Sequence, residues 1–521
     1  MKTPVLIAAG TVFAAAFVWK TFLPAWNVLH TDFPNYYVAA RGTLDGVPLS
    51  ELYEWATFNR LIRDYGIDGQ LGAYAPQPPP AMFLFLPLAR LEPLTAKRVW
   101  LVVNLLLLLA TARMLRASCG LGRIQILALG IAGYGALHTN FLYGQYYVML
   151  LFLLTLAWLL LERWPGAAGA VIGIIAALKL WGAPFALYFA RRGGWRALGG
   201  LVAAVSTAAV ISVVAFGMSG NWFFTTVVLP RAVDGLLIDP YHPVFDSFTV
   251  LLRRAFVREP SLSPAPWLEA PAAFFFLRRL LGFGILGLTL LALPRHDSRV
   301  AFAWFTIALL LVSPVTGSYH MLILVLPVAL LLTGARRRFQ VLLVGLLFAA
   351  AMPFAGFPFH RTFALTALWI VTGISLIRGV QRRELALAAA ALIVVAGAGA
   401  WRQMAEYRRE PAQMYEPVPL PPGTLFASSP AVSTAGLTYD DIRSVRPAGT
   451  EAASPDGRFL AHTRRNQLVL TDLKSNSLRV LTPDHCNSHS PAWSPDSQTL
   501  YFASDCGRGY GLPALYRAGV P

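Results

Sequence analysis

The sequence predicts an α-helical membrane protein that crosses the bilayer many times and ends in a small all-β domain. Three observations predict this fold class: 56% of the 521 residues are apolar, only 13% are charged, and long apolar runs recur as far as residue 401. An ordinary soluble domain has about 25% charged residues. The composition therefore excludes a disordered chain, a disulfide scaffold and a nucleic-acid-binding arm.

Eleven apolar runs reach or approach the length of about 20 residues that a helix needs to cross a bilayer. They fall near residues 4–23, 98–115, 124–138, 146–162, 196–217, 273–293, 300–315, 319–334, 339–354, 362–378 and 384–401. Two further segments, 78–91 and 166–190, are interrupted, the first by prolines and the second by Lys179 and a Gly-Ala-Pro break at 182–184. We predict re-entrant or broken helices there, because irregular backbone at membrane depth occurs where it lines a cavity or packs on protein. The expected total is about 11–13 transmembrane helices.

The net charge of +17 is concentrated in the apolar part of the chain. Residues 1–401 hold 31 Lys and Arg against 15 Asp and Glu, whereas residues 402–521 hold 12 against 11. Basic residues cluster on short connections, while 11 of the 15 carboxylates lie in two long connections, 24–78 and 218–272. The clustered basic residues are Arg113, Arg116, Arg123, Arg191, Arg192, Arg196, Arg295, Arg299, Arg336, Arg337, Arg338, Arg378, Arg382 and Arg383.

This charge pattern predicts the orientation of the chain. Cytoplasmic loops of membrane proteins are enriched in Lys and Arg, so the short basic connections are expected to face the cytoplasm. The N-terminus then lies inside, and the two long loops and the C-terminal domain lie outside. Lys97 and Arg98 are the exception, because this pair falls on the outer side.

A proline-rich linker, 402–422, separates the apolar part from a repeat within 423–521. Ser-Pro-Asp-Gly beginning at Ser454 recurs as Ser-Pro-Asp-Ser beginning at Ser494, a period of 40 residues. A turn followed by a hairpin at this period is typical of β-propeller blades, and the repeats resemble those of TolB-like periplasmic propellers. Two blades, with a weak third over 423–450, are fewer than the four that close a ring. We therefore expect a partial propeller, completed by another chain or left as a remnant.

Cys486 and Cys506 flank the last of these repeats. On the outer side of the membrane they could form a disulfide. The alternative is two free thiols, and the sequence leaves both open.

The first outward loop opens with Asp32, followed by Tyr36 and Tyr37. An acidic residue just past the first span is a candidate general base. The alternative is helix capping, since Asp before Phe-Pro suits the start of a helix. The two roles are compatible, because a capping Asp can also face a cleft at the membrane surface.

Lys179 lies within an apolar segment, where a lysine is costly and indicates a function such as holding a phosphate or pyrophosphate. The alternative is that its ammonium reaches the cytoplasmic edge. Gln145 and His320 lie in short outward turns, where His320 could hydrogen-bond a phosphate or a sugar hydroxyl, or be an interface histidine without a task. The polar candidates of the second long loop are Arg231, His242, Asp246 and Ser247, each of which is more often solvated when taken alone.

Further features stand in a fixed order along residues 5–380. They are Asp32, Phe33, Tyr36, Tyr37, Tyr74, Pro78, Pro79, Pro80, Pro87, Leu88, Trp100, Asn104, Leu105, Gly144, Gln145, Lys179, Pro184, Ser313, Pro314 and His320. This ordered set resembles the polyprenol-phosphate-sugar-dependent glycosyltransferases of the GT-C fold and is most similar to glycosyltransferase family 87, a bacterial mannosyltransferase-like group. The chain departs from the family where the usual Tyr-Pro-Pro reads Tyr-Ala-Pro-Gln-Pro-Pro-Pro and where a single His replaces a common pair. The C-terminal blades are not part of the usual catalytic unit.

The resemblance implies that residues 1–401 transfer a sugar, expected to be mannose, from a polyprenyl phosphate to a hydroxyl of a glycan, glycolipid or protein. The reaction would take place on the outer face of a bacterial inner membrane and invert the anomeric centre. Asp32 would be the general base, and Lys179 and His320 would steady the departing phosphate, with Gln145, Tyr36 and Tyr37 at the donor. We expect no cofactor or metal, because no P-loop, HExxH, GxSxG or paired CxxC motif occurs.

Two other functions fit a membrane protein of this composition. One is a transporter or flippase of lipid-linked glycans, although the chain has neither the internal repeat nor the midplane charge cluster that transporters often show. The other is a non-catalytic membrane anchor that displays the propeller to a protein partner. In that case Asp32 would be replaceable.

Overall fold

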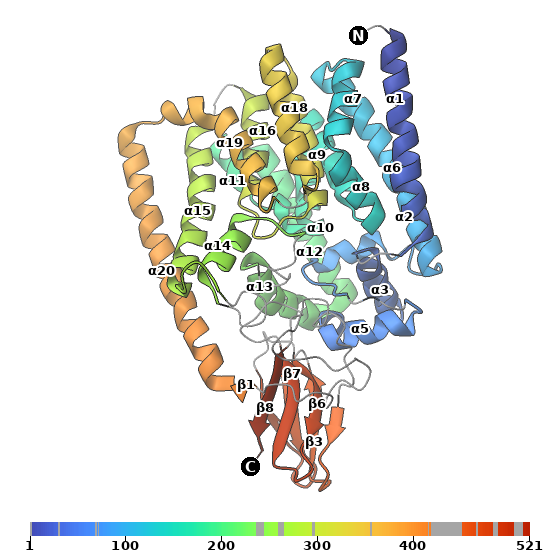
Figure 1. The fold of residues 1–521 in the computed structure, drawn as a ribbon, viewed down its shortest axis with the longest axis vertical. Helices are drawn as coiled ribbons and strands as arrows, with labels where there is room; N and C mark the ends of the chain where they lie inside the picture. The colour runs from blue at the N-terminus through green and yellow to red at the C-terminus, as the bar shows by residue number, and fades with distance from the viewer. Residues whose placement is uncertain are drawn as a thin grey trace.

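The computed structural model is a bundle of helices with a small β domain at one end and the N-terminus at the opposite end (Figure 1). It describes residues 3–29, 32–67, 70, 72–235, 244–258, 265–293, 297–354, 357–414, 416–417, 451–464, 467–482, 488–504 and 514–520. Cys486, Cys506 and His242 lie outside the described residues, as does the weak third blade, so the disulfide stays a prediction.

The helical part contains twenty α-helices among the described residues. They are α1 (Thr3–Phe17), α2 (Leu23–Asn27), α3 (Asp32–Leu44), α4 (Leu49–Leu52), α5 (Trp55–Asp64), α6 (Pro93–Cys119), α7 (Arg123–Ala132), α8 (Tyr134–Tyr143), α9 (Tyr147–Leu160), α10 (Pro165–Leu178), α11 (Phe185–Arg191), α12 (Trp195–Phe223), α13 (Leu229–Val233), α14 (Phe248–Phe256), α15 (Pro271–Ala292), α16 (Ser298–Leu311), α17 (Val325–Leu332), α18 (Arg337–Ala351), α19 (His360–Arg378) and α20 (Arg382–Met414). Short π-helical segments are η1 (Val18–Phe22) and η4 (Phe224–Val228), and short 3₁₀ segments are η2 (Pro79–Leu84), η3 (Leu180–Gly182) and η5 (Ser318–Leu324).

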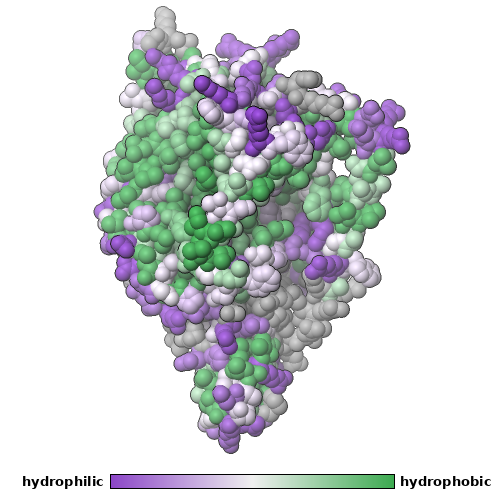
Figure 2. Space-filling view, turned by 180° about the vertical axis from the view of Figure 1, so that it is seen from behind, coloured by the Kyte–Doolittle hydropathy of each residue, from purple (hydrophilic) through white to green (hydrophobic). Residues whose placement is uncertain are grey.

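The predicted helical membrane protein is confirmed. Among the described residues, six helical stretches are long and apolar enough to cross a membrane: Pro4–Leu44, Pro93–Cys119, Trp195–Val233, Pro271–Ala292, His360–Arg378 and Arg382–Ala405. Five shorter apolar helices accompany them: Arg123–Ala132, Tyr147–Leu160, Pro165–Leu178, Ser298–Leu311 and Ser318–Leu332. In Figure 2 apolar side chains form a broad band across the helical part, and hydrophilic ones gather at the end opposite the β domain. Such a band is the surface that lipid covers.

Both interrupted segments are irregular, as the sequence predicts. Residues 78–91 contain only the six-residue 3₁₀ helix η2 followed by turns, which at about 2 Å per residue is far shorter than a bilayer. Residues 166–190 form α10 and α11, separated by an extended backbone at Lys179 and by η3. The break places the Lys179 side chain at a helix end rather than on a continuous helix face.

Helix α10, which leads to Lys179, packs directly on the backbone of α12. A Cβ on Gly169 would lie 1.8 Å from the carbonyl oxygen of Ala197, and a Cβ on Gly200 would lie 2.0 Å from that of Gly166. Small residues allow such close approach in membrane helices, where packing drives association. The glycines therefore fix the height and angle of α10 against the bundle.

We expect Gly169→Leu to lower the midpoint of thermal unfolding in detergent, because its side chain has no space between α10 and α12. Overpacking of this kind costs about 1–3 kcal/mol or more. The matched control is Gly199→Leu on α12, since nothing lies within 4 Å of a Cβ there. Equal unfolding midpoints for the two variants would contradict the described packing.

The β domain consists of two four-stranded antiparallel sheets, in the orders β2-β3-β4-β5 and β1-β8-β7-β6. The strands are β1 (Glu416–Pro417), β2 (Glu451–Ala453), β3 (Phe459–Arg464), β4 (Gln467–Asp472), β5 (Ser477–Val480), β6 (Ser488–Trp493), β7 (Thr499–Ser504) and β8 (Ala514–Gly519). The predicted propeller is not confirmed: the described part of the domain shows two small sheets and no ring of blades.

The repeat nevertheless has a physical basis in the turn that opens each hairpin. Ser454 donates to Asp456 at 2.5 Å and accepts from the Phe459 amide at 2.8 Å. Forty residues later, Ser494 donates to Asp496 at 2.5 Å and accepts from the Thr499 amide at 2.9 Å. The same short side chains therefore close the same turn in both sheets.

The β domain touches the helical part through His489 of β6. Its imidazole lies 4.9 Å from the ring of Trp55 at the start of α5. Burial lowers the pKa of His489 to about 4, so the ring is neutral at physiological pH. The contact rests on ring packing rather than on charge.

Candidate functional site

A cavity of about 1040 Å³ lies where α3, the 72–77 segment, the turn between α8 and α9, the α10 break and η5 meet. Five of the six site residues predicted from the sequence line it: Asp32, Tyr36, Gln145, Lys179 and His320. Tyr37 does not line it and instead donates to the carbonyl oxygen of Leu91 at 2.7 Å. Residues that are far apart in the chain thus meet at one place.

Asp32 is the first residue of α3 and is partly buried. A carboxylate in the first turn of a helix is favoured by the helix dipole, so the structural role that the sequence suggests is compatible with facing the cavity. The charge of Asp32 also acts on the ammonium groups of Lys97 and Lys179. These cations favour its ionised form, which is the form that can accept a proton.

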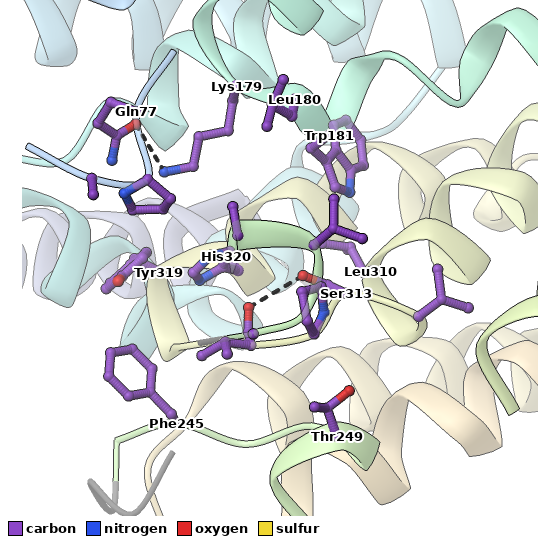
Figure 3. Close-up of a pocket in the computed structure, with 18 of the residues that line it drawn as sticks. Gln77, Lys179, Leu180, Trp181, Phe245, Thr249, Leu310, Ser313, Tyr319 and His320 are labelled. Atoms are coloured by element: carbon purple, nitrogen blue, oxygen red, sulfur yellow. Dashed lines mark hydrogen bonds between the residues drawn. The ribbon is translucent and has the colours of Figure 1, made fainter. Parts of the chain in front are cut away.

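The Lys179 ammonium is held by a small set of polar and aromatic groups. It donates to Gln77 Oε1 at 3.2 Å and lies 5.4 Å and 5.6 Å from the ring centroids of Tyr146 and Tyr147 (Figure 3). The Tyr146 hydroxyl hydrogen-bonds the same Gln77 oxygen and lies 3.0 Å from the carbonyl oxygen of Leu178. The Lys179 ammonium therefore has a defined position, and among the described residues no carboxylate oxygen lies within 4 Å of it. An ammonium in that state can bind a phosphate without first breaking an ion pair.

Gln145 follows a tight turn that ends α8. Gly144 adopts φ 67°, and a Cβ on it would lie 2.7 Å from the Cβ of Phe33. Both the positive φ and the lack of space therefore require glycine at this position. The Tyr36 hydroxyl donates to Gln145 Oε1 at 2.6 Å. This bond joins α3, which carries Asp32, to the turn between α8 and α9.

His320 lies on η5 and lines the same cavity as Gln77 and Lys179 (Figure 3). The Gly317 amide donates to Nδ1 of His320 at 2.9 Å, so the neutral ring carries its proton on Nε2. The ring packs against Tyr147 and Tyr319, with centroid distances of 4.6 Å in both cases. His320 can therefore act as a hydrogen-bond donor with a fixed orientation.

Two of the polar candidates of the second long loop, Asp246 and Ser247, have structural roles. Asp246 accepts from the Arg361 amide at 3.1 Å and from the Thr362 hydroxyl, and so caps the start of α19. Ser247 accepts from the Val250 amide at 3.1 Å and donates to the Pro314 carbonyl oxygen at 2.6 Å. These contacts attach the loop to the turn that precedes η5.

Three groups at or near the site are absent from the sequence-based set. No sequence pattern identifies Gln77 as a site residue, because its importance comes only from the groups that surround it in the structure. Arg278 and Arg279 line the cavity from α15, where a pair of arginines inside an apolar run is a signal that could have been used. Arg278 forms an ion pair with Asp234 at 2.5 Å, and Arg279 donates to Gln403 of α20 at 2.6 Å.

Apolar residues line the cavity together with these arginines. Gly282, Phe283 and Leu286, which follow the arginines along α15, line the cavity, as do Leu180 and Trp181 of η3. The cavity lining thus combines charged and polar side chains with apolar ones, which suits an amphiphilic molecule with a charged head and a hydrocarbon chain.

Comparison with known proteins relates part of this chain to a family. Residues 77–314 match the model of glycosyltransferase family 87. The match confirms the resemblance over that region and, with the apolar helices, supports a membrane glycosyltransferase. No curated protein and no solved structure matches the chain. Gln77, Gln145 and Lys179 lie within the region that matches family 87, whereas Asp32 and His320 lie outside it.

Proposed function

We propose that the protein transfers a sugar, mannose in the first instance, from a polyprenyl phosphate to a hydroxyl acceptor on the outer face of a bacterial inner membrane. One observation carries the proposal: a carboxylate and a lysine from distant parts of the chain line the same amphiphilic cavity. Its apolar side chains would contact the polyprenyl chain, and its polar and charged side chains would bind the phosphate and the sugar. The similarity to family 87 supports the reaction class.

The chemistry needs only groups that the cavity supplies. The Asp32 carboxylate takes the proton of the acceptor hydroxyl, whose oxygen then attacks the anomeric carbon from the face opposite the phosphate. The bond from that carbon to the phosphate oxygen breaks, and polyprenyl phosphate leaves with the electron pair. Lys179 and the Nε2–H of His320 stabilise the charge on the leaving oxygens. The configuration at the anomeric carbon is inverted, and the proton remains on Asp32.

We infer the orientation from the charge distribution of the sequence. The N-terminus, with the basic connections, would lie in the cytoplasm, and the cavity side of the bundle with the β domain would lie outside. A polyprenyl-phosphate sugar would then reach the cavity from the outer leaflet, and the acceptor would be a glycan, glycolipid or protein in the same compartment. In this orientation the β domain would meet either the acceptor or a protein partner.

The test is sugar transfer in sealed right-side-out membrane vesicles from cells that produce the protein. We expect radiolabelled mannose to move from polyprenyl-phosphate mannose into a product that membrane-impermeant periodate can oxidise. Vesicles without the protein are the control, and other polyprenyl-phosphate sugars show which donor is used. Absence of transfer from every donor would instead favour a transporter of lipid-linked glycans or a membrane anchor, and a product protected from periodate would reverse the orientation.

A further inference from the structure

Lys97 is a buried charge to which the proposed reaction gives no task. It lies in the first turns of α6, and its side chain is 0% exposed. By the charge pattern of the sequence it also falls on the expected outer side of the membrane, away from the clusters of basic residues on the short connections. A lysine buried in a membrane protein is costly unless its protons are bonded, so its place requires a reason.

The Lys97 ammonium bonds two helix ends at once. It donates to the carbonyl oxygen of Val28 at 2.6 Å and to that of Leu142 at 2.8 Å. Val28 is the residue that ends α2, and Leu142 lies in the last turn of α8. Carbonyls at helix C-termini lack helical partners and carry partial negative charge, so a cation satisfies both.

Each of these helix ends leads directly to the candidate site. Val28 comes four residues before Asp32, and Leu142 comes three residues before Gln145. The neighbouring residues of α6 reinforce the two connections. Arg98 donates to the Trp26 carbonyl oxygen at 3.1 Å, and Trp100 donates to that of Gly144 at 3.0 Å.

The positive charge of Lys97 also acts on Asp32. Other titratable groups face the same carboxylate from the elements packed around it. They are Tyr36 of α3, Tyr147 of α9, Lys179 after α10 and Tyr319 of η5. Of these described groups and Lys97, the two lysines carry a positive charge, and Lys179 also lines the cavity.

We propose that Lys97 is a positioning residue for the general base. Its ammonium holds the ends of α2 and α8 together, so that Asp32 and Gln145 both stay at the cavity. Its positive charge keeps Asp32 ionised. Lys97 does not line the cavity, so it acts through Asp32 rather than on the substrate. The inference rests on the proposed role of Asp32 as base.

The test compares pH–rate profiles of Lys97→Met, Lys97→Gln and Lys97→Arg with that of the wild type. Loss of a nearby cation favours the protonated carboxyl, so we expect the acid limb for Lys97→Met to move up by about one pH unit. Lys97→Gln should move the limb in the same way, and Lys97→Arg should restore it because the charge is kept. Lys20→Met, at an exposed position on η1, is the control and should leave the profile unchanged.

Hydrogen exchange measures whether Lys97 holds the ends of α2 and α8 together, and this measurement requires no transfer activity. We expect faster exchange in peptides covering 25–29 and 139–146 for Lys97→Met, and a smaller increase for Lys97→Gln, which keeps a donor. A loss of rate that is equal at every pH, or exchange that matches the wild type, would overturn the proposal. If the wild type transfers no sugar, the proposed function fails, and the exchange data still decide whether Lys97 holds the two helix ends.

Discussion

Replacing Asp32 with asparagine is expected to lower kcat for sugar transfer by about 10²–10⁴-fold, the usual contribution of a general base. Asparagine has nearly the same size as aspartate but cannot accept the proton of the acceptor hydroxyl. It is also about as favourable as aspartate at the start of a helix. The substitution therefore separates the chemical role of Asp32 from its structural role at the first residue of α3. Initial rates at saturating donor in proteoliposomes measure the effect.

The matched control is Asp45→Asn in the same outer loop. Asp45 accepts from Arg41 at 3.3 Å and from the Tyr65 hydroxyl at 2.8 Å, and it does not line the cavity. We expect Asp45→Asn to keep transfer near the wild-type rate. The unfolding midpoint of Asp32→Asn should change little, because a charge near a helix N-terminus contributes only about 0.3–1 kcal/mol. Transfer by Asp32→Asn at the wild-type rate would refute the assignment of the base.

The sequence predicts the site in part because its main residues stand at breaks in an apolar pattern. Lys179 interrupts an apolar segment, and Gln145 follows a glycine turn, so both attract notice without a structure. The sequence does not show which of Tyr36 and Tyr37 lines the site. Neighbouring positions on a helix point about 100° apart, so the two side chains have different surroundings. Only the three-dimensional arrangement shows that Tyr36 faces the cavity and Tyr37 bonds the Leu91 carbonyl.

Lys97 and Gln77 show where reasoning from the sequence stops. Counting charges treats Lys97 as a residue of an outer loop, because the count does not register burial. The structure instead places its ammonium at the ends of two helices. Gln77 lies in an irregular segment without periodicity, and its bonds to Tyr146 and Lys179 join residues 69 and 102 positions away. Such long-range partners leave no local pattern.

The β domain illustrates the same limit in another way. The 40-residue repeat predicts two hairpin units, and both are present. The fourth strand of the second sheet is β1, which directly follows α20 and pairs with β8 about 100 residues later: Glu416 lies opposite Arg517. A repeat in the sequence relates one hairpin unit to the next. It gives no indication that β1, which precedes the first unit, pairs with β8 and completes the second sheet.

Replacing Lys179 with methionine is expected to lower kcat by about 10²–10³-fold, because the departing phosphate would lose its nearest positive charge. The same change should weaken inhibition by the product polyprenyl phosphate at least about tenfold, since a charge-assisted hydrogen bond to phosphate would be lost. Methionine keeps the length and flexibility of the side chain, so the packing on Tyr146 and Tyr147 is largely retained. Steady-state rates and product-inhibition constants measure the two effects.

Two further variants separate the charge of Lys179 from its position. Gln77→Leu removes the acceptor that orients the ammonium at 3.2 Å but leaves the charge, so we expect a loss of kcat smaller than that of Lys179→Met. Lys20→Met removes an exposed lysine of the first span and should change neither measurement. If Lys179→Met were inhibited by polyprenyl phosphate as strongly as the wild type, the phosphate would bind elsewhere in the cavity. Arg278 and Arg279, which line the cavity from α15, would then be the cations to test.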